Sequence, residues 1–273
     1  MNRILASAQI EFIVALRNRW VAISVGMMVL FSLVLSAAGS APTGALGADK
    51  LSITVASLTS LAVYLVPLVA LLMSFDAIAG EIERGTLPLV LIYPVTRGEL
   101  VTGKFIAHLT ILALAVAAGY GIAAIVAIAT NANALAGAPA MFRLFWSSIL
   151  LGATFLGIGY AISGFARRTG AAAGLVIGLW LVLIVLYDLG LLAAIVANDG
   201  GTFTTQYFPW LLLGNPADAF RLYNLAVSDA TSAAAGLTGA ANSIPAVHAL
   251  VSILVWPMIA TGLAWLTFRR VTP

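Results

Sequence analysis

The sequence lacks cysteine and contains few charged residues. With no cysteine among its 273 residues, the chain has neither a disulfide nor a thiolate metal ligand, and cysteine usage leaves its redox compartment undetermined. Only 8% of the residues are charged while 62% are hydrophobic, which excludes a soluble domain, because a wettable surface needs more polar side chains. The composition therefore indicates an integral membrane protein.

Histidine is also scarce, and His108 and His248 have no second metal ligand near them in the sequence. Because a copper or zinc site needs several converging ligands, we expect no metal site, and lone histidines of this kind usually pack or form hydrogen bonds. The sequence also has no paired carboxylates within one apolar run and no Ser/His/Asp set, which argues against a membrane enzyme. We expect a non-catalytic subunit.

One fragment of a nucleotide-binding pattern is present, since Gly98, Gly103 and Lys104 spell G-x-x-x-x-G-K. A phosphate-binding loop needs Ser or Thr next and connects a strand to a helix, whereas Phe105 follows here and opens an apolar run. We therefore expect no cofactor in this chain, and any ATP and Mg²⁺ would be bound by a partner subunit.

Six long apolar runs separate short segments that hold almost all the charges. Each run reaches the roughly 20 residues that a helix needs to cross about 30 Å of hydrocarbon. Runs of this length without strict alternation favour helices over barrel strands, because the backbone must satisfy its own hydrogen bonds in lipid. The predicted fold class is all-α, a polytopic membrane protein whose six transmembrane helices cover residues 20–38, 53–75, 105–130, 144–166, 170–197 and 246–268.

The basic residues are distributed unevenly between the two sides of these runs. Ten of the 13 Lys and Arg residues fall on one side, and Lys50, Arg143 and Arg221 fall on the other. The positive-inside rule then places both termini in the cytoplasm. Because the basic residues lie at the membrane ends and form no stripe interleaved with aromatic residues, we expect contact with the lipid bilayer and no nucleic-acid partner.

The predicted organisation follows from this orientation. Apolar residues recur at helical spacing within residues 1–19, which predicts an amphipathic helix on the cytoplasmic membrane surface, the alternative being a frayed polar leader. The membrane domain covers 20–268, with a cytoplasmic loop at 76–104 and a periplasmic segment at 198–245 that we expect to contain short re-entrant helices. Residues 269–273 form a cytoplasmic tail.

The loop at 76–104 is the most highly charged part of the chain. Its stretches GEIERGTL (80–87), YPVTRGEL (93–100) and GKF (103–105) resemble the first cytoplasmic loop of ABC-2 type permeases, the membrane subunits of one class of ATP-binding-cassette transporters. In that family the loop carries a coupling helix that docks on an ATPase subunit. The resemblance implies ATPase contacts at Glu81, Glu83, Arg84, Arg97 and Glu99, with a smaller second contact at Arg167 and Arg168.

Other interpretations of these charges stay open. From the residues alone, the loop charges could simply keep a loop in water, and the arginine pair could simply anchor the topology. The resemblance further implies a bacterial inner-membrane location and an assembly of two copies of this chain with two ATPase subunits.

A narrower resemblance covers most of the chain. RNRW (17–20), LYDLG (186–190) and NPADAFRLYNL (215–225) resemble the branch of the family that serves copper-site maturation of nitrous oxide reductase in denitrifying bacteria. It implies a periplasmic copper-handling protein as a further partner. The alternative is an ABC-2 exporter of a small sulfur-containing, copper-containing or lipid-like substrate.

The periplasmic segment begins with an apolar, aromatic stretch that must be covered by membrane, by the helix bundle or by a partner. Asn215 followed by proline is a helix-start signal. We expect a surface for the periplasmic partner, with packing against the bundle as the alternative for the aromatic residues, and its candidate contacts are Trp210, Asn215, Asp218, Arg221 and Tyr223.

Two features of the fifth run complete the candidate sites. Asp188 lies deep within the run, where it must face protein or water because a charge in lipid is costly. It is a polar joint, a cavity-lining group or a protonated packing residue. Gly170, Gly174 and Gly178 form two small-x-x-x-small steps that permit close helix approach, either within one subunit or in the dimer that the resemblance implies.

Overall fold

The protein is described here by a computed structural model of residues 2–38, 50–92, 95–130, 132–198, 201, 203–225 and 245–271. These residues form helices and no strand, which confirms the all-α prediction. The α-helices are α1 (Asn2–Leu16), α2 (Arg19–Ala38), α3 (Lys50–Ser74), α4 (Asp76–Glu83), α5 (Leu87–Leu91), α6 (Arg97–Thr130), α7 (Ala138–Ala166), α8 (Thr169–Trp180), α9 (Tyr187–Ala197), α10 (Phe208–Gly214), α11 (Pro216–Leu225) and α13 (Ala246–Arg269).

Three short helices of other types connect them: the 3-10 helix η1 (Ala132–Gly137) and the π-helices η2 (Leu181–Leu186) and η3 (Phe203–Tyr207). The π-helix η2 joins α8 to α9, so one long apolar helix runs from Thr169 to Ala197 with a wider turn in its middle. Residues 226–244 of the predicted periplasmic segment lie outside the described residues.

Five helical stretches of the described chain are long and apolar enough to cross a membrane, at Leu51–Glu83, Arg97–Thr130, Leu135–Ala166, Thr169–Ala197 and Ala246–Arg269. A sixth is obtained if α1 and α2 count together, but these helices meet at an angle of 73°. The bend at Arg17 and Asn18 separates the predicted N-terminal helix from the first apolar run. The chain is thus a multi-pass membrane protein.

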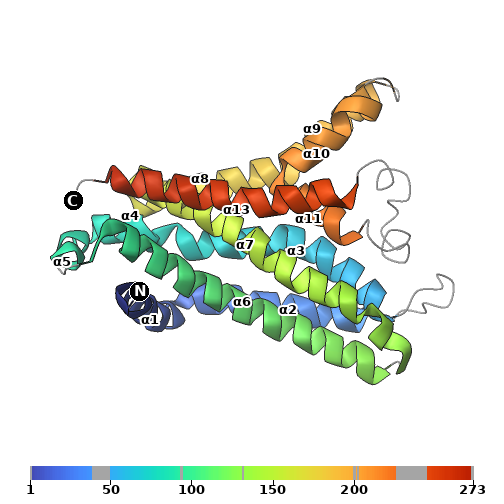
Figure 1. Ribbon diagram of the computed structural model, residues 1–273, viewed down its shortest axis with the longest axis horizontal. Helices are drawn as coiled ribbons and strands as arrows, with labels where there is room; N and C mark the ends of the chain where they lie inside the picture. Colours follow the sequence, from blue (N-terminus) through green and yellow to red (C-terminus); the bar gives the residue numbers. More distant parts are fainter. Residues whose placement is uncertain are drawn as a thin grey trace.

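The bundle has two distinct ends (Figure 1). At one end, which we call the terminal end, lie α1, α4, α5 and the C-terminal end of α13. At the other, the far end, lie η1 and α11, and here α9 and α10 diverge together from the bundle. The candidate residues therefore gather in two places, one at each end.

Helices α3 and α7 form the centre of the bundle, with their buried side chains in one core that includes Val66, Val69, Leu151 and Phe155. Small residues let α7 approach α13 closely: a Cβ atom added at Gly157 would lie 2.8 Å from the backbone carbonyl carbon of Ala260. The helix of α8, η2 and α9 is different, because the rest of the described chain buries only 6% of its most apolar 18 residues. This helix lies at the edge of the bundle.

Candidate functional site

The loop between α3 and α6 is folded into two short helices, α4 and α5, at the terminal end (Figure 1). Helix α4 ends where Gly85 adopts a positive φ of 66°, a conformation that glycine adopts without strain. The amide of Thr86 then donates to the carbonyl oxygen of Glu81 at 2.9 Å, and α5 begins with proline in its first turn. The sequence thus creates a sharp corner between the two helices.

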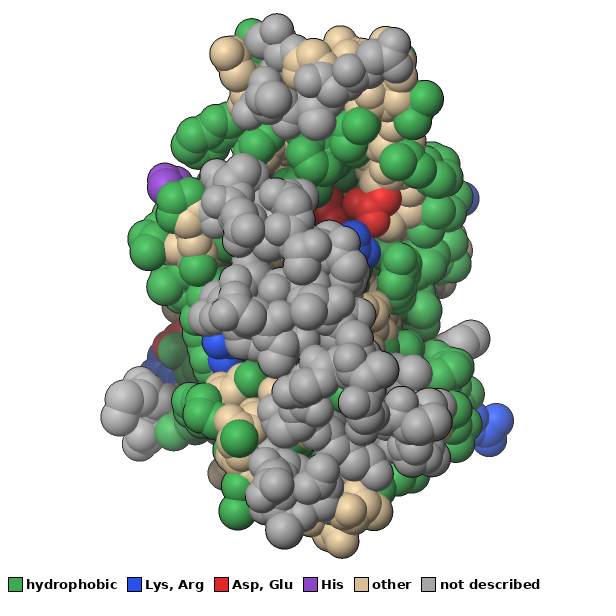
Figure 2. All heavy atoms as spheres, turned by 90° about the vertical axis from the view of Figure 1, so that its right-hand side faces the viewer, with side chains coloured by type: hydrophobic (Ala, Val, Ile, Leu, Met, Phe, Trp, Pro, Cys, Tyr) green, Lys and Arg blue, Asp and Glu red, His purple; other side chains and the backbone are tan. Residues whose placement is uncertain are grey.

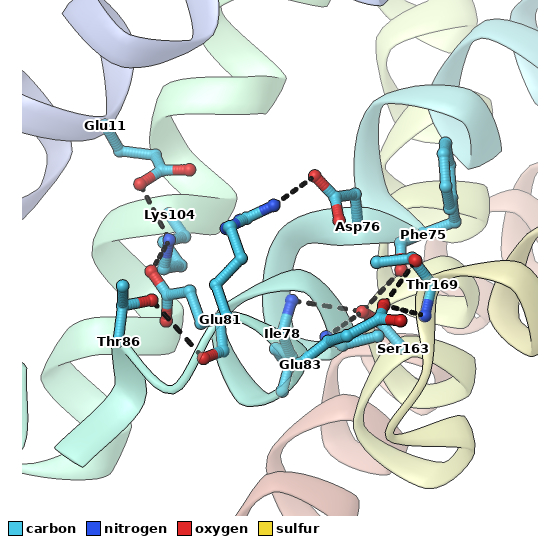
Figure 3. A network of polar contacts seen from close by, with 12 residues as sticks. Glu11, Phe75, Asp76, Ile78, Glu81, Glu83, Thr86, Lys104, Ser163 and Thr169 are labelled. Carbon is cyan, nitrogen blue, oxygen red and sulfur yellow. Dashed lines mark hydrogen bonds and ion pairs between the residues drawn. The ribbon is translucent and has the colours of Figure 1, made fainter.

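Ser163 of α7 fixes the beginning of α4 (Figure 3). Its hydroxyl donates to the carbonyl oxygen of Phe75 at 2.6 Å and accepts from the amides of Ile78 at 3.0 Å and Ala79 at 2.9 Å. The first amides of a helix have no partner within the helix, so one side chain here supplies what α4 lacks. Sequence reasoning missed Ser163, because nothing local to it signals a contact with a segment more than 80 residues away.

Glu83 links α4 to the start of α8. Its carboxylate accepts from the amide of Thr169 at 2.9 Å and from the Thr169 hydroxyl, so it caps a helix that belongs to another part of the chain. Arg167, which has a positive φ of 55°, and Arg168 precede this cap and are exposed. The structure therefore brings together the two segments that the sequence predicted as a larger and a smaller contact.

A buried cluster of charges joins α4 to α1 and α6 (Figure 3). The ammonium of Lys104 lies 2.7 Å from Glu11 Oε2 and 2.8 Å from Glu81 Oε1, and the Lys104 side chain is only 5% exposed. His108 lies beside this cluster, 3.8 Å from Glu11, and its Nδ1 is hydrogen-bonded to the Tyr160 hydroxyl at 2.6 Å. A cavity of about 100 Å³ adjoins the cluster. We call Glu11, Lys104 and Glu81 the lysine cluster.

The lysine cluster changes the interpretation of Glu81. The sequence interpretation placed this carboxylate among exposed contacts, whereas the structure turns it inward onto Lys104 and leaves the side chain 16% exposed. The reason is that a buried ammonium needs carboxylate partners, and α4 is the helix that can supply one here. His108 behaves as expected for a packed, hydrogen-bonded residue.

Arg97 and Glu99 also have structural partners. Thr96 and Glu99 form a capping box at the start of α6, with the Thr96 amide donating to Glu99 at 2.8 Å and the Glu99 amide donating to the Thr96 hydroxyl at 3.2 Å. The T-x-x-E spacing could have revealed this cap. The Arg97 guanidinium donates to the carbonyl oxygens of Phe268 and Val271, which ties the end of α13 to the start of α6.

Two apolar side chains on and beside α5 are well exposed near the predicted contact. Leu89 is 61% exposed and Ile92 is 77% exposed, while Leu87 is buried against the bundle. Arg84 is exposed next to them and forms an ion pair of 3.5 Å with Asp76. This surface, which we call the α5 face, combines an apolar centre with flanking charge.

At the far end, Asn215 marks the junction of α10 and α11. Its side-chain oxygen accepts from the amide of Ala217 at 2.9 Å, as the N-cap prediction requires, and its amide donates to the carbonyl oxygen of Leu183 at 2.6 Å. Leu183 lies in the π-helix η2, whose wider turn interrupts the regular hydrogen bonding of the span. Tyr187 adds a second link by donating to the carbonyl oxygen of Leu211 at 2.6 Å.

Asp188 is the third link, because the guanidinium of Arg221 lies 3.1 Å from it. The same guanidinium lies 3.5 Å from Asp218, so one cation is placed between two carboxylates. Asp188 is therefore a polar joint between helices that also lines a cavity, two of the roles predicted for it. We call Asp188, Arg221 and Asp218 the arginine cluster.

The expected partner surface at the far end is only partly accessible. Trp210 is 64% exposed and stacks edge-on against His248, and Tyr223 is half-buried against Trp146. Asn215 and Asp218 are buried within this chain and offer no accessible surface in this arrangement, so their contact with a partner stays a prediction. Both were assigned to the surface because they are polar, but their side chains cap a helix and join the arginine cluster.

The remaining candidates lie on the long helix formed by α8, η2 and α9, which we call the edge helix. Gly170, Gly174 and Gly178 have no atom within 4 Å of an added Cβ, so no other part of the described chain packs on this stripe. The described residues contain no group of three or more His, Asp or Glu side chains that could hold a metal ion.

Comparison with known proteins supports this description. Residues 5–272 match the family model described as ABC-2 family transporter protein. The chain is 40% identical over 279 residues to a probable ABC transporter permease protein, NosY, of Stutzerimonas stutzeri, covering 99% of each chain. It is 43% identical over 267 residues to the protein with the same description in Pseudomonas aeruginosa PAO1, covering 96% of each.

Proposed function

The chain belongs to the ABC-2 transporter family and is the membrane permease subunit of an ABC transporter, and from this premise we propose that it converts ATP hydrolysis by separate ATPase subunits into movement at its far end. The observation that carries the proposal is the α5 face at the tip of the terminal end, where Leu89 and Ile92 are exposed. Exposed apolar side chains rimmed by charge are typical of surfaces that bind another protein. On this proposal the ATPase binds there, and the terminal end faces the cytoplasm.

The attachments of α4 explain how a pull on α5 would spread. Helix α4 is fastened to α7 by Ser163, to α8 by Glu83 and to α6 by Lys104. Since packed helices move between discrete arrangements as stiff bodies, displacement of α4 would be felt by three membrane spans at once. In this scheme Glu81 is a positioning residue, and Arg84 with Arg167 and Arg168 are the charges available to the ATPase.

The edge helix offers a route to the far end. It begins at the Glu83 cap and continues through η2 to the contacts with Asn215 and Arg221. The candidate regions at the terminal end and at the far end therefore both contact this one helix. We propose that its exposed glycine stripe packs against a second copy of the chain in a homodimer. A periplasmic copper-handling protein would then bind near Trp210, in support of copper-site maturation of nitrous oxide reductase, as the resemblance of residues 215–225 implies.

The ATPase contact is tested by making the α5 face polar. The double variant Leu89→Ser with Ile92→Ser should weaken capture of a co-expressed ATPase by about tenfold or more, the size expected when central apolar anchors are removed from an interface. Stimulated ATP hydrolysis should fall in parallel. The matched control is Leu135→Ser, an apolar residue at the far end that is also 61% exposed. Unchanged ATPase capture by the double variant would refute the proposed contact.

A further inference from the structure

A cavity at the far end lies between α9, α10 and α11 and is not explained by the proposed function. Its volume is about 250 Å³, and its walls are largely apolar, with Leu191, Phe208 and Leu212 among the lining residues. The arginine cluster lines the same cavity. Seen from the far end, acidic side chains lie beside a basic one, with hydrophobic side chains next to them (Figure 2).

The arginine cluster has one more acid than base. Arg221 supplies a single guanidinium, at 3.1 Å from Asp188 and at the longer distance of 3.5 Å from Asp218. The Asp218 side chain is only 3% exposed, and its Oδ2 atom has no hydrogen-bond donor among the described residues. A buried carboxylate oxygen without a donor is costly, because it has lost its water and gained nothing in return.

Among the side chains that the structure describes, the helices that pack against α11 supply no second cation to this pair. Helix α10 has no charged residue, and α9 contributes Tyr187 beside Asp188. The titratable groups on the other neighbours are engaged with other partners or exposed: Arg143 of α7 donates to the carbonyl oxygen of Asn224, His248 of α13 stacks on Trp210, and Tyr64 of α3 is exposed. The charge imbalance is therefore local to the arginine cluster.

We propose that Asp188 and Asp218 form a proton-binding site, and that the proton they share holds α11 against α9. With the proton on Asp218, Oδ2 becomes a donor to the Asp188 carboxylate, and the orphan oxygen is satisfied. Loss of the proton to water leaves two adjacent carboxylates with one guanidinium, which repel each other and favour separation of the two helices.

The electrostatics of Asp218 agree with this geometry. Burial, and then the charge of Asp188, raise the pKa of the Asp218 carboxyl from 3.8 to about 7, against the opposing effect of Arg221. Because the pKa is raised when the helices are joined, the joined state is favoured at low pH and loses this advantage as the pH rises from about 4 to about 7, by up to about tenfold per pH unit. The site therefore releases its proton near neutral pH.

The surrounding contacts show how release of the proton would loosen the α10–α11 elbow from the membrane span. The same region holds the π-helix η2, and π-turns within helices frequently mark functional positions. If the arginine cluster opens, the polar links that still join the α10–α11 elbow to the span among the described residues run from Asn215 to Leu183 and from Tyr187 to Leu211. This inference concerns the far end alone and stands whether or not an ATPase binds the α5 face.

The absence of cysteine makes a clean test possible. Spin labels at Leu189→Cys on α9 and Trp210→Cys on α10, both exposed positions, would report by pulsed electron paramagnetic resonance how far the α10–α11 elbow moves from α9. The full chain would be reconstituted in phosphatidylcholine nanodiscs and diluted with unlabelled chain to suppress distances between subunits. We expect one short distance at pH 6 and a growing longer population as the pH rises to 8.5.

The variant Asp218→Asn should keep the short distance at both pH values, because an amide donates to Asp188 and does not ionise. Tyr187→Phe is the matched control: it removes a link to α10 without a titrating group, so the midpoint pH should stay in place. The proposal fails if Asp218→Asn follows the wild-type pH curve. It also fails if the distance responds to an added alkylamine or to phosphatidylethanolamine and not to pH, which would make an ammonium group the ligand.

An infrared measurement on the wild-type chain gives an answer that no folding defect can obscure. A protonated carboxylic acid absorbs separately from a carboxylate, so the band should be present at pH 6 and lost as the pH rises through about 7. A spectrum with no such band at pH 6 would overturn the proposal.

Discussion

The lysine cluster and the arginine cluster have the same composition, one cation between two carboxylates, but they differ in how closely the groups meet. Lys104 lies within 2.8 Å of both Glu11 and Glu81, and the three residues belong to α1, α4 and α6. Arg221 reaches Asp188 at 3.1 Å and Asp218 only at 3.5 Å, between a membrane span and a short helix. The first arrangement is tight and the second is loose.

The comparison teaches that the number of charges does not decide the role of a buried cluster. Two short ion pairs offset the cost of removing the Lys104 ammonium from water, so the lysine cluster acts as a fixed fastening. Each cluster leaves one carboxylate oxygen without a donor, on Glu81 and on Asp218, and each borders a cavity, so what separates the clusters is the length of their ion pairs. The arginine cluster is instead sensitive to a proton.

The largest effect is expected from Lys104→Met, which tests whether the lysine cluster is a fastening. It leaves two buried carboxylates without their cation, and loss of one partner from a buried ion pair costs about 3–5 kcal/mol. The free energy of unfolding, measured by chemical denaturation in detergent, should fall by that amount. A matched triple variant, Lys104→Met with Glu11→Gln and Glu81→Gln, should recover most of the loss, because no uncompensated charge remains. A Lys104→Met chain as stable as the wild type would contradict the fastening.

A smaller effect is expected from Ser163→Ala, which tests whether neutral hydrogen bonds contribute to the stability of α4 at the terminal end. The change removes one hydroxyl that serves three backbone groups of the α4 region, and buried groups left without partners cost about 1–3 kcal/mol. Hydrogen exchange of α4 amides should accelerate. Ser60→Ala is the control, because the Ser60 hydroxyl only donates within its own helix, to Ala56, and its loss should change little.

Arg221→Leu should cost about 1–2 kcal/mol at pH 8, since the residue is partly exposed and its contacts are longer. At pH 6 the cost should be smaller, because Asp218 then holds a proton and only Asp188 needs the guanidinium. The sign follows from the raised pKa of Asp218, which makes the carboxyl neutral below about 7 and charged above it. Arg143→Leu is the control: Arg143 donates to a backbone carbonyl, so its removal should have a cost that does not depend on pH. If the Arg221→Leu and Arg143→Leu variants depended equally on pH, the arginine cluster would not be the pH-sensitive group, and its distinction from the lysine cluster would be lost.

The sequence was sufficient to predict the helical membrane fold, since apolar runs of the necessary length are a local property. It also predicted the helix start at Asn215, because a cap depends on neighbouring residues. Figure 3 shows what it could not predict: Glu11 meets Lys104 across 93 positions, and Ser163 meets Phe75 across 88. Such pairs depend on packing between helices, which no local pattern encodes.

The same limitation explains why the sequence did not reveal the partners that the candidate residues have within the chain. Polar residues near a membrane surface were assigned to partners outside the chain, yet Glu81, Asp218 and Asn215 all have partners within it. In a chain with so few charges, each buried one needs another nearby, and this demand competes with contacts to other proteins. The apolar residues Leu89 and Ile92, which local polarity did not mark, are exposed beside the charged residues Glu83 and Arg84.

The smallest effect on stability, and the sharpest test of how the two ends communicate, is expected at the Glu83–Thr169 contact. Glu83 is exposed, so Glu83→Ala should leave the unfolding transition almost unchanged. If α4 moves the edge helix through this cap, however, the variant should reduce ATPase stimulation several-fold, and Thr169→Ala should do the same. The double variant should then be no worse than either single one, because both remove one interaction. Effects that simply add would show that Glu83 and Thr169 act separately, and the edge helix would have to receive its motion from the bundle core.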